Sequence, residues 1–306
     1  MQLSQVIDGF FIVRRTRLAP TTQTNYRYCF QRLTNFLGSE RDFASITASD
    51  IRAFIDHLQN DGLSDRSVHD NLAICSALWT FAKSEFKLPH VIKEVEKPAY
   101  NKKEIIPFTE DEIKAIMDAA EWTAHWDTRL GKNVRSKRST WRRDLAIIVL
   151  LLDTGLRVSE MCKLKIGDYQ QDNGRLMVRH GKGNKQRPVF LGATAQRVLW
   201  RYLMSRDRIK PSDPIFVTRY NKALHRTYVL HLMGRFGDNA GVVNVHPHRF
   251  RHTFAIQFLR NGGNVFELQR ILGHVDLETV KIYVNLAQVD IERAQKAHSP
   301  ADNWRL

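Results

Sequence analysis

Apolar residues recur every three to four positions through the first hundred residues, which is the spacing of one face of a helix. This pattern predicts helices over residues 4–13, 20–38, 47–62 and 64–82. Thr47 and Ser64 stand where N-caps are expected, because their hydroxyl oxygens accept hydrogen bonds from free backbone N–H groups. Gly38 and Gly62 are expected to end the second and third helices. The aromatic residues on the apolar faces are expected to fill a shared core.

The pattern becomes more mixed in the second part of the chain. A capping box at residues 109–112 predicts the start of a helix, and a strongly apolar helix is expected at residues 144–153. Residues 174–180 and 186–191 alternate between apolar and polar positions, which predicts a hairpin around a glycine-rich turn. Further helices are predicted at residues 224–236, 247–259, 264–272, 276–286 and 288–296. The fold class is therefore mainly α with one small antiparallel β-sheet.

A polar stretch separates the two patterns. Residues 97–103 contain three lysines and a proline and show no apolar periodicity. We therefore interpret residues 98–106 as a linker between a helical domain at residues 1–97 and a second domain at residues 107–306.

Composition places the chain among folded globular proteins. Its 306 residues and its apolar share of 43% are enough to build two cores. No stretch approaches the roughly 20 apolar residues of a membrane span, and the N-terminus lacks the pattern of a secretory signal. Cys29, Cys75 and Cys162 lie far apart without metal-ligand spacing, and their odd number favours buried free thiols in a reducing compartment. We expect a cytoplasmic protein.

The net charge of +15 is concentrated in the second part of the chain. Residues 1–98 carry 12 Lys and Arg against 11 Asp and Glu, whereas residues 99–306 carry 35 against 21. This surplus favours a polyanionic partner, without separating DNA from RNA or an anionic membrane. Residues 121–144 are either a loop that contacts a phosphate backbone or a solvated surface loop. Seven cations fall in this weakly patterned stretch: Arg129, Lys132, Arg135, Lys137, Arg138, Arg142 and Arg143.

Five short motifs in the second domain carry residue types that suit phosphate chemistry. Arginine, for example, binds phosphate oxygens bidentately and stays charged. In chain order the motifs place Arg157 after Gly-Leu, Lys182 in Gly-Lys-Gly-Asn-Lys, His248 and Arg251 in Pro-His-Arg-Phe-Arg-His, His274 after Leu-Gly, and Tyr283 nine residues later. Each motif alone arises often by chance, but the shared order does not. From about residue 106 to about residue 290 the chain resembles the tyrosine recombinase/integrase family, which includes Xer-type recombinases and phage and transposon integrases.

The resemblance implies an N-terminal helical core-binding domain, which is SAM-like, and an α-rich catalytic domain of the DNA breaking–rejoining fold. It implies that double-stranded DNA sites are cut and rejoined through a 3′-phosphotyrosyl link and a Holliday junction, with no cofactor, metal or ATP. It also implies a homo-tetramer on two DNA sites, in which a C-terminal helix after residue 286 docks on a neighbouring subunit, and accessory proteins.

The resemblance also assigns roles to single residues. Tyr283 is the expected nucleophile, Arg157 and Arg251 bind the scissile phosphate, His248 acts as an acid/base or hydrogen-bonding group, Lys182 protonates the leaving 5′ oxygen, and His274 donates a hydrogen bond to the scissile phosphate. Glu160 either orients Arg157 or a neighbouring histidine, or forms a structural salt bridge. His252 is expected to support the site by packing behind it. Further DNA contacts are expected from Lys185, Arg187 and Arg249.

Three other interpretations compete with this one. His246, His248, His252 and His274 suggest a metal site, but Arg249 and Arg251 lie between them and would repel a cation, so we predict no metal. A type IB topoisomerase uses similar chemistry but rejoins the same strand, and the helical N-terminal domain argues against it. A catalytically silent DNA-binding factor is the alternative that is not an enzyme, and the intact set of motifs argues against it.

Overall fold

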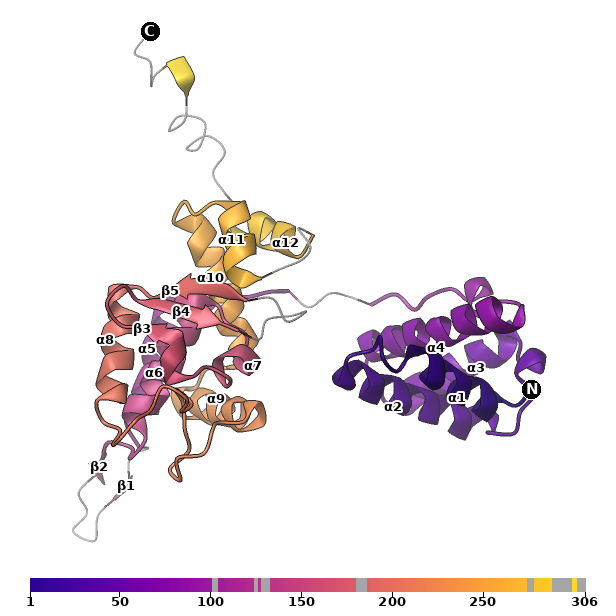
Figure 1. Ribbon diagram of the computed structural model, residues 1–306, viewed down its shortest axis with the longest axis horizontal. Coiled ribbons are helices and arrows are strands. Elements are labelled where there is room, and N and C mark those ends of the chain that lie inside the picture. Colours follow the sequence, from indigo (N-terminus) through magenta and orange to yellow (C-terminus); the bar gives the residue numbers. More distant parts are fainter. Residues whose placement is uncertain are drawn as a thin grey trace. The chain divides into compact units, whose positions relative to one another are not determined.

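The chain forms two compact units, Met1–Lys103 and Glu104–Leu306. A computed structural model describes the chain except for residues 101–103, 124–125, 128–132, 180–185, 274–277, 288–298 and 302–306. Each unit has its own hydrophobic core. Figure 1 shows a first unit made of helices alone and a second that combines helices with two small sheets.

The first unit consists of four helices, as its apolar pattern predicts. The helices are α1 (Leu3–Arg14), α2 (Pro20–Leu37), α3 (Ala48–Asn60) and α4 (Asp65–Phe86), with short 3-10 turns at Phe43–Ser45 and Val91–Glu94. Thr47 caps α3, because its hydroxyl accepts a hydrogen bond from the Asp50 N–H at 3.3 Å. Ser64 caps α4 by accepting from the Ser67 N–H at 3.3 Å. Both predicted N-caps are confirmed.

Aromatic rings form the centre of the first unit's core. The Phe10 ring meets the rings of Phe30 and Phe81 edge to face, with centroids 5.4 and 5.6 Å apart. Trp79 and Phe54 are almost completely buried beside them. Cys29 and Cys75 are buried in the same core as free thiols, and Cys162 in the second unit is a half-buried free thiol. The predicted aromatic core is confirmed.

The second unit is built around one buried helix, α6. Its helices are α5 (Glu110–Glu121), α6 (Trp141–Thr154), α7 (Val158–Met161), α8 (Ala193–Leu203), α9 (Arg226–Ala240), α10 (Pro247–Arg260), α11 (Val265–Leu272) and α12 (Glu278–Ala287). Helix α6 packs against α5, α8 and α10, so apolar side chains cover most of its surface. Helix α8 has no counterpart among the predicted helices. Its exposed Trp200 and Met204 interrupt the apolar stripe that Ala195, Leu199 and Tyr202 bury.

A three-stranded antiparallel sheet lies beside these helices. The strands are β3 (Tyr169–Gln170), β4 (Arg175–Val178) and β5 (Arg187–Phe190), paired in that order. Strands β4 and β5 are the predicted hairpin, and Leu176 pairs with Val189 so that both side chains enter the core. Strand β3 is an addition to the prediction, because two residues are too few to show alternation.

The stretch at residues 121–144 is not the continuous loop that its polar pattern predicts. It contains a small antiparallel pair, β1 (Trp126–Asp127) with β2 (Asn133–Val134). Helix α6 then begins at Trp141, three residues before its predicted start. The charges of Arg143 and Asp144 hide this start in the sequence, because the two side chains are buried as a pair. In Figure 1 the β1–β2 pair lies at the end of the second unit opposite α11 and α12.

Helices α10, α11 and α12 pack together in a separate small cluster. Buried Ala255, Ile256, Leu259, Leu268, Leu272 and Tyr283 make up its centre. The predicted helices at 264–272 and 276–286 are confirmed with small changes at their ends, whereas the one at 288–296 lies outside the described residues. None of the described helices is long and apolar enough to cross a membrane.

Candidate active site

A sharp turn at the end of α6 positions Arg157. Gly155 has φ +59°, a conformation that side chains other than glycine disfavour. A Cβ added there would lie 2.5 Å from the Phe254 ring and 2.8 Å from the Leu272 side chain. Only glycine therefore allows α6 to end so close to α10 and α11. The turn places Arg157 at the N-cap of the short helix α7, beside these two helices.

Glu160 is a buried carboxylate that holds two arginines. Its oxygens accept hydrogen bonds from the Arg157 side chain at 3.1 Å and from both terminal nitrogens of Arg187 at 3.0 and 3.1 Å. Burial acts to raise the pKa of Glu160, but the bonds from Arg187 and Arg157 outweigh it and leave the pKa lowered. Glu160 therefore stays ionised. The two predicted roles coincide here, because the salt bridge from Glu160 also orients the Arg157 side chain.

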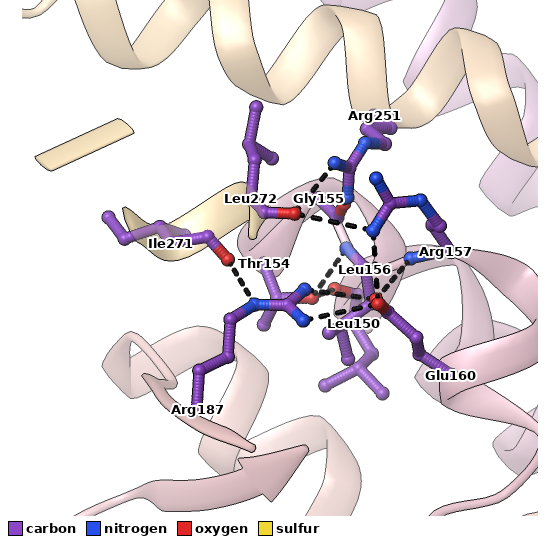
Figure 2. Close-up of polar contacts among 10 residues, drawn as sticks. All are labelled: Leu150, Thr154, Gly155, Leu156, Arg157, Glu160, Arg187, Arg251, Ile271 and Leu272. Atoms are coloured by element: carbon purple, nitrogen blue, oxygen red, sulfur yellow. Dashed lines mark hydrogen bonds and ion pairs between the residues drawn. The ribbon is translucent and has the colours of Figure 1, made fainter. Parts of the chain in front are cut away.

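Arg251 is held by backbone carbonyl oxygens. Its two terminal nitrogens donate to the Gly155 carbonyl at 2.6 Å and to the Leu272 carbonyl at 2.8 Å. Arg157 also donates to the Leu272 carbonyl, at 3.5 Å. Figure 2 shows the Leu272 carbonyl between the guanidinium groups of Arg251 and Arg157, with the Glu160 carboxylate between Arg157 and Arg187. Three elements distant in sequence thus meet at one carbonyl oxygen.

The cluster is rich in guanidinium groups. Among the described residues, Glu160 forms ion pairs with Arg157 and Arg187, and Arg251 lies close enough to all three for their charges to affect it. Burial, together with the nearby charge of Arg157, lowers the pKa of Arg251 to about 10, so the guanidinium remains protonated at neutral pH. A cluster of guanidinium groups suits an anion that gains negative charge during reaction.

The two histidines of α10 differ in what they contact. His252 Nδ1 lies 2.9 Å from the Tyr283 hydroxyl oxygen, within hydrogen-bond distance. Burial and the neighbouring His248 lower the pKa of His252 to about 4. Burial and the charge of Arg251 also lower the pKa of His248. Both imidazoles are therefore neutral near pH 7. The predicted packing role of His252 understates its position, because it touches the predicted nucleophile directly.

Tyr283 lies on α12 and is 3% exposed. Burial raises the pKa of its hydroxyl, while the charges of Arg251 and Arg157 act in the opposite direction. The phenol is therefore protonated at neutral pH in this state. The contact with His252 fixes the hydroxyl against α10, which also carries Arg251.

Five predicted site residues fall outside the residues that the structure describes: Lys182, Lys185, His274, Arg129 and Lys132.

Four cations of the 121–144 stretch that are not fully buried have acidic or aromatic partners. Arg135 pairs with Asp118, and Lys137 pairs with Glu121. The guanidinium of Arg142 lies over its neighbouring Trp141 ring, 4.5 Å from the centroid. Arg138 packs against Phe236, with its guanidinium 5.2 Å from the ring centroid.

Two arginines from the predicted DNA-contact set are buried inside the fold. Arg143 is 4% exposed and donates to Asp144 at 2.7 and 2.8 Å, to the Val217 carbonyl and to the Tyr228 hydroxyl.

Arg249 is 8% exposed and donates to Glu112 at 2.9 and 3.0 Å and to the carbonyls of Ile106 and Val243. These internal bonds speak against a phosphate contact at either position. Arg187 is also turned inward, toward Glu160 and the Ile271 carbonyl. Arg187 supports the cluster by holding the Glu160 carboxylate in place.

One histidine of this region, His246, has a structural role. His246 caps α10, because its Nδ1 accepts a hydrogen bond from the Arg249 N–H at 3.2 Å. Within the described residues, no group of three or more His, Cys, Asp or Glu side chains is arranged to hold a metal ion.

Comparison with known families adds to this geometry. The model of the phage integrase family matches residues 107–289, which include Arg157, His248, Arg251 and Tyr283. The chain belongs to this family. A second model, the SAM-like N-terminal domain of phage integrases, matches residues 11–83. The mainly helical fold and the N-terminal SAM-like domain that the sequence predicts are therefore confirmed.

Individual relatives agree with the family. The tyrosine recombinase XerA of Pyrococcus horikoshii is 35% identical over 257 residues, which cover 82% of this chain and 80% of the relative. XerA of Thermococcus kodakarensis is 30% identical and covers 91% of this chain and 89% of its own length. Such relatives make the chain a tyrosine-type site-specific recombinase. The Tn1549 transposon integrase, solved with transposon right-end DNA, superposes with a TM-score of 0.80 at 17% identity over 96% of this chain and 99% of its own, so it shares the fold.

Sequence reasoning missed the backbone part of this site. The carbonyl oxygens of Gly155 and Leu272 orient Arg251, yet no side-chain pattern marks a carbonyl. The only signal in the sequence is the glycine before Leu156-Arg157, which allows α6 to turn beside α11.

Proposed function

We propose that the chain binds duplex DNA and recombines two sites by cutting and rejoining strands through a covalent link between Tyr283 and a 3′ phosphate. One observation carries this proposal. Tyr283 is hydrogen-bonded to His252, the residue after Arg251, and Arg251 shares the Leu272 carbonyl with Arg157. Residues 1–97 would then serve as the core-binding domain and residues 107–306 as the catalytic domain.

In this proposal the scissile phosphate lies at the guanidinium groups of Arg157 and Arg251. Arg157 has an exposed side-chain fraction of 24%, so part of it faces solvent while Glu160 holds the rest. The guanidinium groups of Arg157 and Arg251 match a phosphodiester that gains a second negative charge as the tyrosine attacks. Glu160 and Arg187 hold Arg157 in position, and we expect neither of them to touch the reacting atoms.

In the first step the Tyr283 oxygen forms a bond to phosphorus and the bond from phosphorus to the 5′ oxygen breaks. The phenol proton has an acceptor in His252 Nδ1, which is 2.9 Å away and unprotonated near pH 7. Lys182 supplies a proton to the 5′ oxygen, and His248 and His274 hydrogen-bond the phosphate. In the second step the 5′ hydroxyl of the partner duplex attacks the phosphotyrosyl link, which restores the phenol.

The energy of the broken phosphodiester bond is kept in the phosphotyrosyl link, so we propose that the reaction proceeds without ATP or a divalent metal. Exchange of one strand pair at a time leads through a Holliday junction, which requires four copies of the chain on two DNA sites. The segment after Leu286 docks on a neighbouring copy in this arrangement. The Tn1549 transposon integrase and a lambda integrase dimer have both been solved on DNA, which supports a DNA partner.

The test is covalent trapping on a nicked suicide substrate. The wild-type chain should form a protein–DNA adduct on a denaturing gel, in buffer that contains excess EDTA. Tyr283→Phe should bind the same DNA and form no adduct. An adduct with the Phe variant would overturn the assignment of the nucleophile, and loss of the wild-type adduct in EDTA would overturn metal independence. In a separate assay on supercoiled plasmid, relaxed plasmid without recombinant product would indicate a topoisomerase instead.

A further inference from the structure

A polar pocket of about 250 Å³ lies at the end of α6 opposite the candidate active site. The start of α6, the end of α8 and the loop at residues 217–221 line it. The residues that matter for its chemistry are Ser139, Thr140, Arg142, Ser205, Arg206 and Arg219.

The pocket has the charge of an anion site. Arg142, Arg206 and Arg219 contribute three guanidinium groups, and none of the described residues that line it is acidic. The carboxylate of Asp144 is wholly buried behind it and already bound by Arg143. Hydroxyl groups of serine and threonine stand between the arginines. Arginine and hydroxyl donors together are the groups that bind phosphate oxygens.

Donor groups in this pocket lack acceptors. The Arg206 Nε is buried and has no hydrogen-bond partner within the described parts of the chain. The same guanidinium is held in place, because one of its terminal nitrogens donates to the carbonyls of Pro214 and Ile215, each at 2.7 Å. These bonds fix the guanidinium, so its positive charge stays at the wall of the pocket.

The first turn of α6 adds further donors. Thr140 stands at its N-cap but does not cap it, because its hydroxyl donates to the Asp144 carboxylate at 2.8 Å instead. The backbone N–H groups of Arg142 and Arg143 consequently have no hydrogen-bond partner among the residues that the structure describes. Uncapped N–H groups at the start of a 14-residue helix favour an anion there.

We propose that this pocket binds a second phosphate of the DNA backbone, remote from the phosphate that is cut. This assignment rests on the proposed function, because it places the same duplex at both ends of α6. A helix of 14 residues rises about 20 Å. On a duplex that runs parallel to α6, at roughly 3.4 Å per base pair, this distance spans about six base pairs. Such a contact fixes the register of the protein on DNA without reading base sequence.

The first test replaces two exposed arginines of the pocket. Arg142→Gln with Arg219→Gln should leave the fold intact and lower the slope of log affinity against log salt by about 0.9 for each phosphate that the variant no longer binds. The matched control is Lys114→Gln with Arg197→Gln, which removes the same charge from exposed positions outside the pocket. An equal change in both double variants would overturn the proposal, because it would reflect net charge alone.

The second test locates the phosphate. Neutral methylphosphonate groups are placed singly along the DNA, and binding of wild-type and R142Q/R219Q chains is compared. One position about six base pairs from the cut should weaken the wild type but not the double variant. Absence of coupling at every position would overturn the assignment.

Two control experiments distinguish DNA-backbone binding from binding of a free anion and test the proposed function separately. Titration of the DNA-free chain with inorganic phosphate tests for a free anion. Phosphate binding that R142Q/R219Q abolishes, without coupling to any DNA phosphate, would overturn the backbone assignment. Covalent adduct formation at saturating R142Q/R219Q chain tests the proposed function separately. We expect it to persist, and coupling found in a chain that forms no adduct would support the pocket while overturning the proposed function.

Discussion

A buried arginine lies at each end of α6, Arg143 on the helix itself and Arg251 on the neighbouring α10, but their acceptors differ. At the N-terminal end, Arg143 is bound by the Asp144 carboxylate, so the pair is neutral. At the C-terminal end, Arg251 is bound by two backbone carbonyls, which orient it without cancelling its charge. The first arrangement stabilises the fold, and the second maintains a positive field where Tyr283 lies. The role of an arginine in this chain therefore depends on what accepts its hydrogen bonds.

The largest effect is expected from Arg143→Met. The change leaves the Asp144 carboxylate buried without its partner, which should lower the free energy of unfolding of the second unit by about 3–5 kcal/mol. Urea denaturation of the full chain measures this. Adduct formation below the unfolding transition should be unchanged. Adding Asp144→Asn should restore part of the stability, and a stable single variant would contradict the neutral-pair interpretation.

Arg251→Gln should act on the reaction instead of the fold. Removal of one charged donor from the phosphate site should slow adduct formation by about 10²- to 10³-fold at saturating chain. Arg251→Lys is the matched control, because it keeps the charge but lacks the fork that reaches both carbonyls. We expect it to fall between the wild type and Gln. An unchanged rate for Gln would place the phosphate elsewhere.

Arg249→Met tests a second internal pair with a more accessible partner. Glu112 has an exposed side-chain fraction of 26%, so water partly compensates for the missing arginine. We expect a loss of about 1–3 kcal/mol in the free energy of unfolding, smaller than for Arg143→Met, with the salt dependence of DNA binding unchanged. A lower salt slope would restore Arg249 as a phosphate contact.

The smallest effect is expected from His252→Asn, through pH. The pKa of His252 is about 4 in the folded chain and near 6.5 when unfolded. Between these values the unfolded chain binds more protons, so folding stability should fall as pH falls from about 6.5 to about 4. His252→Asn should remove part of this loss, as thermal unfolding at several pH values would show. At pH 7 the same variant should slow adduct formation if His252 accepts the phenol proton.

Sequence patterns predicted those helices and caps that are determined by interactions between residues close together in the chain. The four N-terminal helices and the caps at Thr47 and Ser64 follow from apolar spacing and N-cap chemistry, both of which act within a few residues. The start of α6 and strand β3 escaped prediction, because tertiary packing decides them. Arg143 was predicted in the basic stretch and Asp144 at the start of the apolar helix, yet the structure buries both as a pair.

For the site, the sequence identified residue types but not their partners. The motifs pointed to Arg157, Arg251 and Tyr283, and the structure brings these into one region. Arg249 lies between His248 and Arg251 in the same motif, yet its guanidinium turns toward Glu112. A sequence motif fixes the order of residues along a helix, whereas the direction of each side chain depends on the neighbouring helix that it meets.

Leu272 both packs in the core and orients two arginines, which has a consequence for genetic selections. Its side chain is fully buried among α10, α11 and α12, and its carbonyl oxygen accepts from Arg251 and Arg157. A change in the packing of α11 therefore moves the acceptor that aims both guanidinium groups. A selection for altered recombination rate should return apolar substitutions around Leu268 and Leu272 as well as changes of charged residues. Suppressors of a weak Arg251 variant should map to the same apolar contacts, at side chains that do not themselves touch DNA.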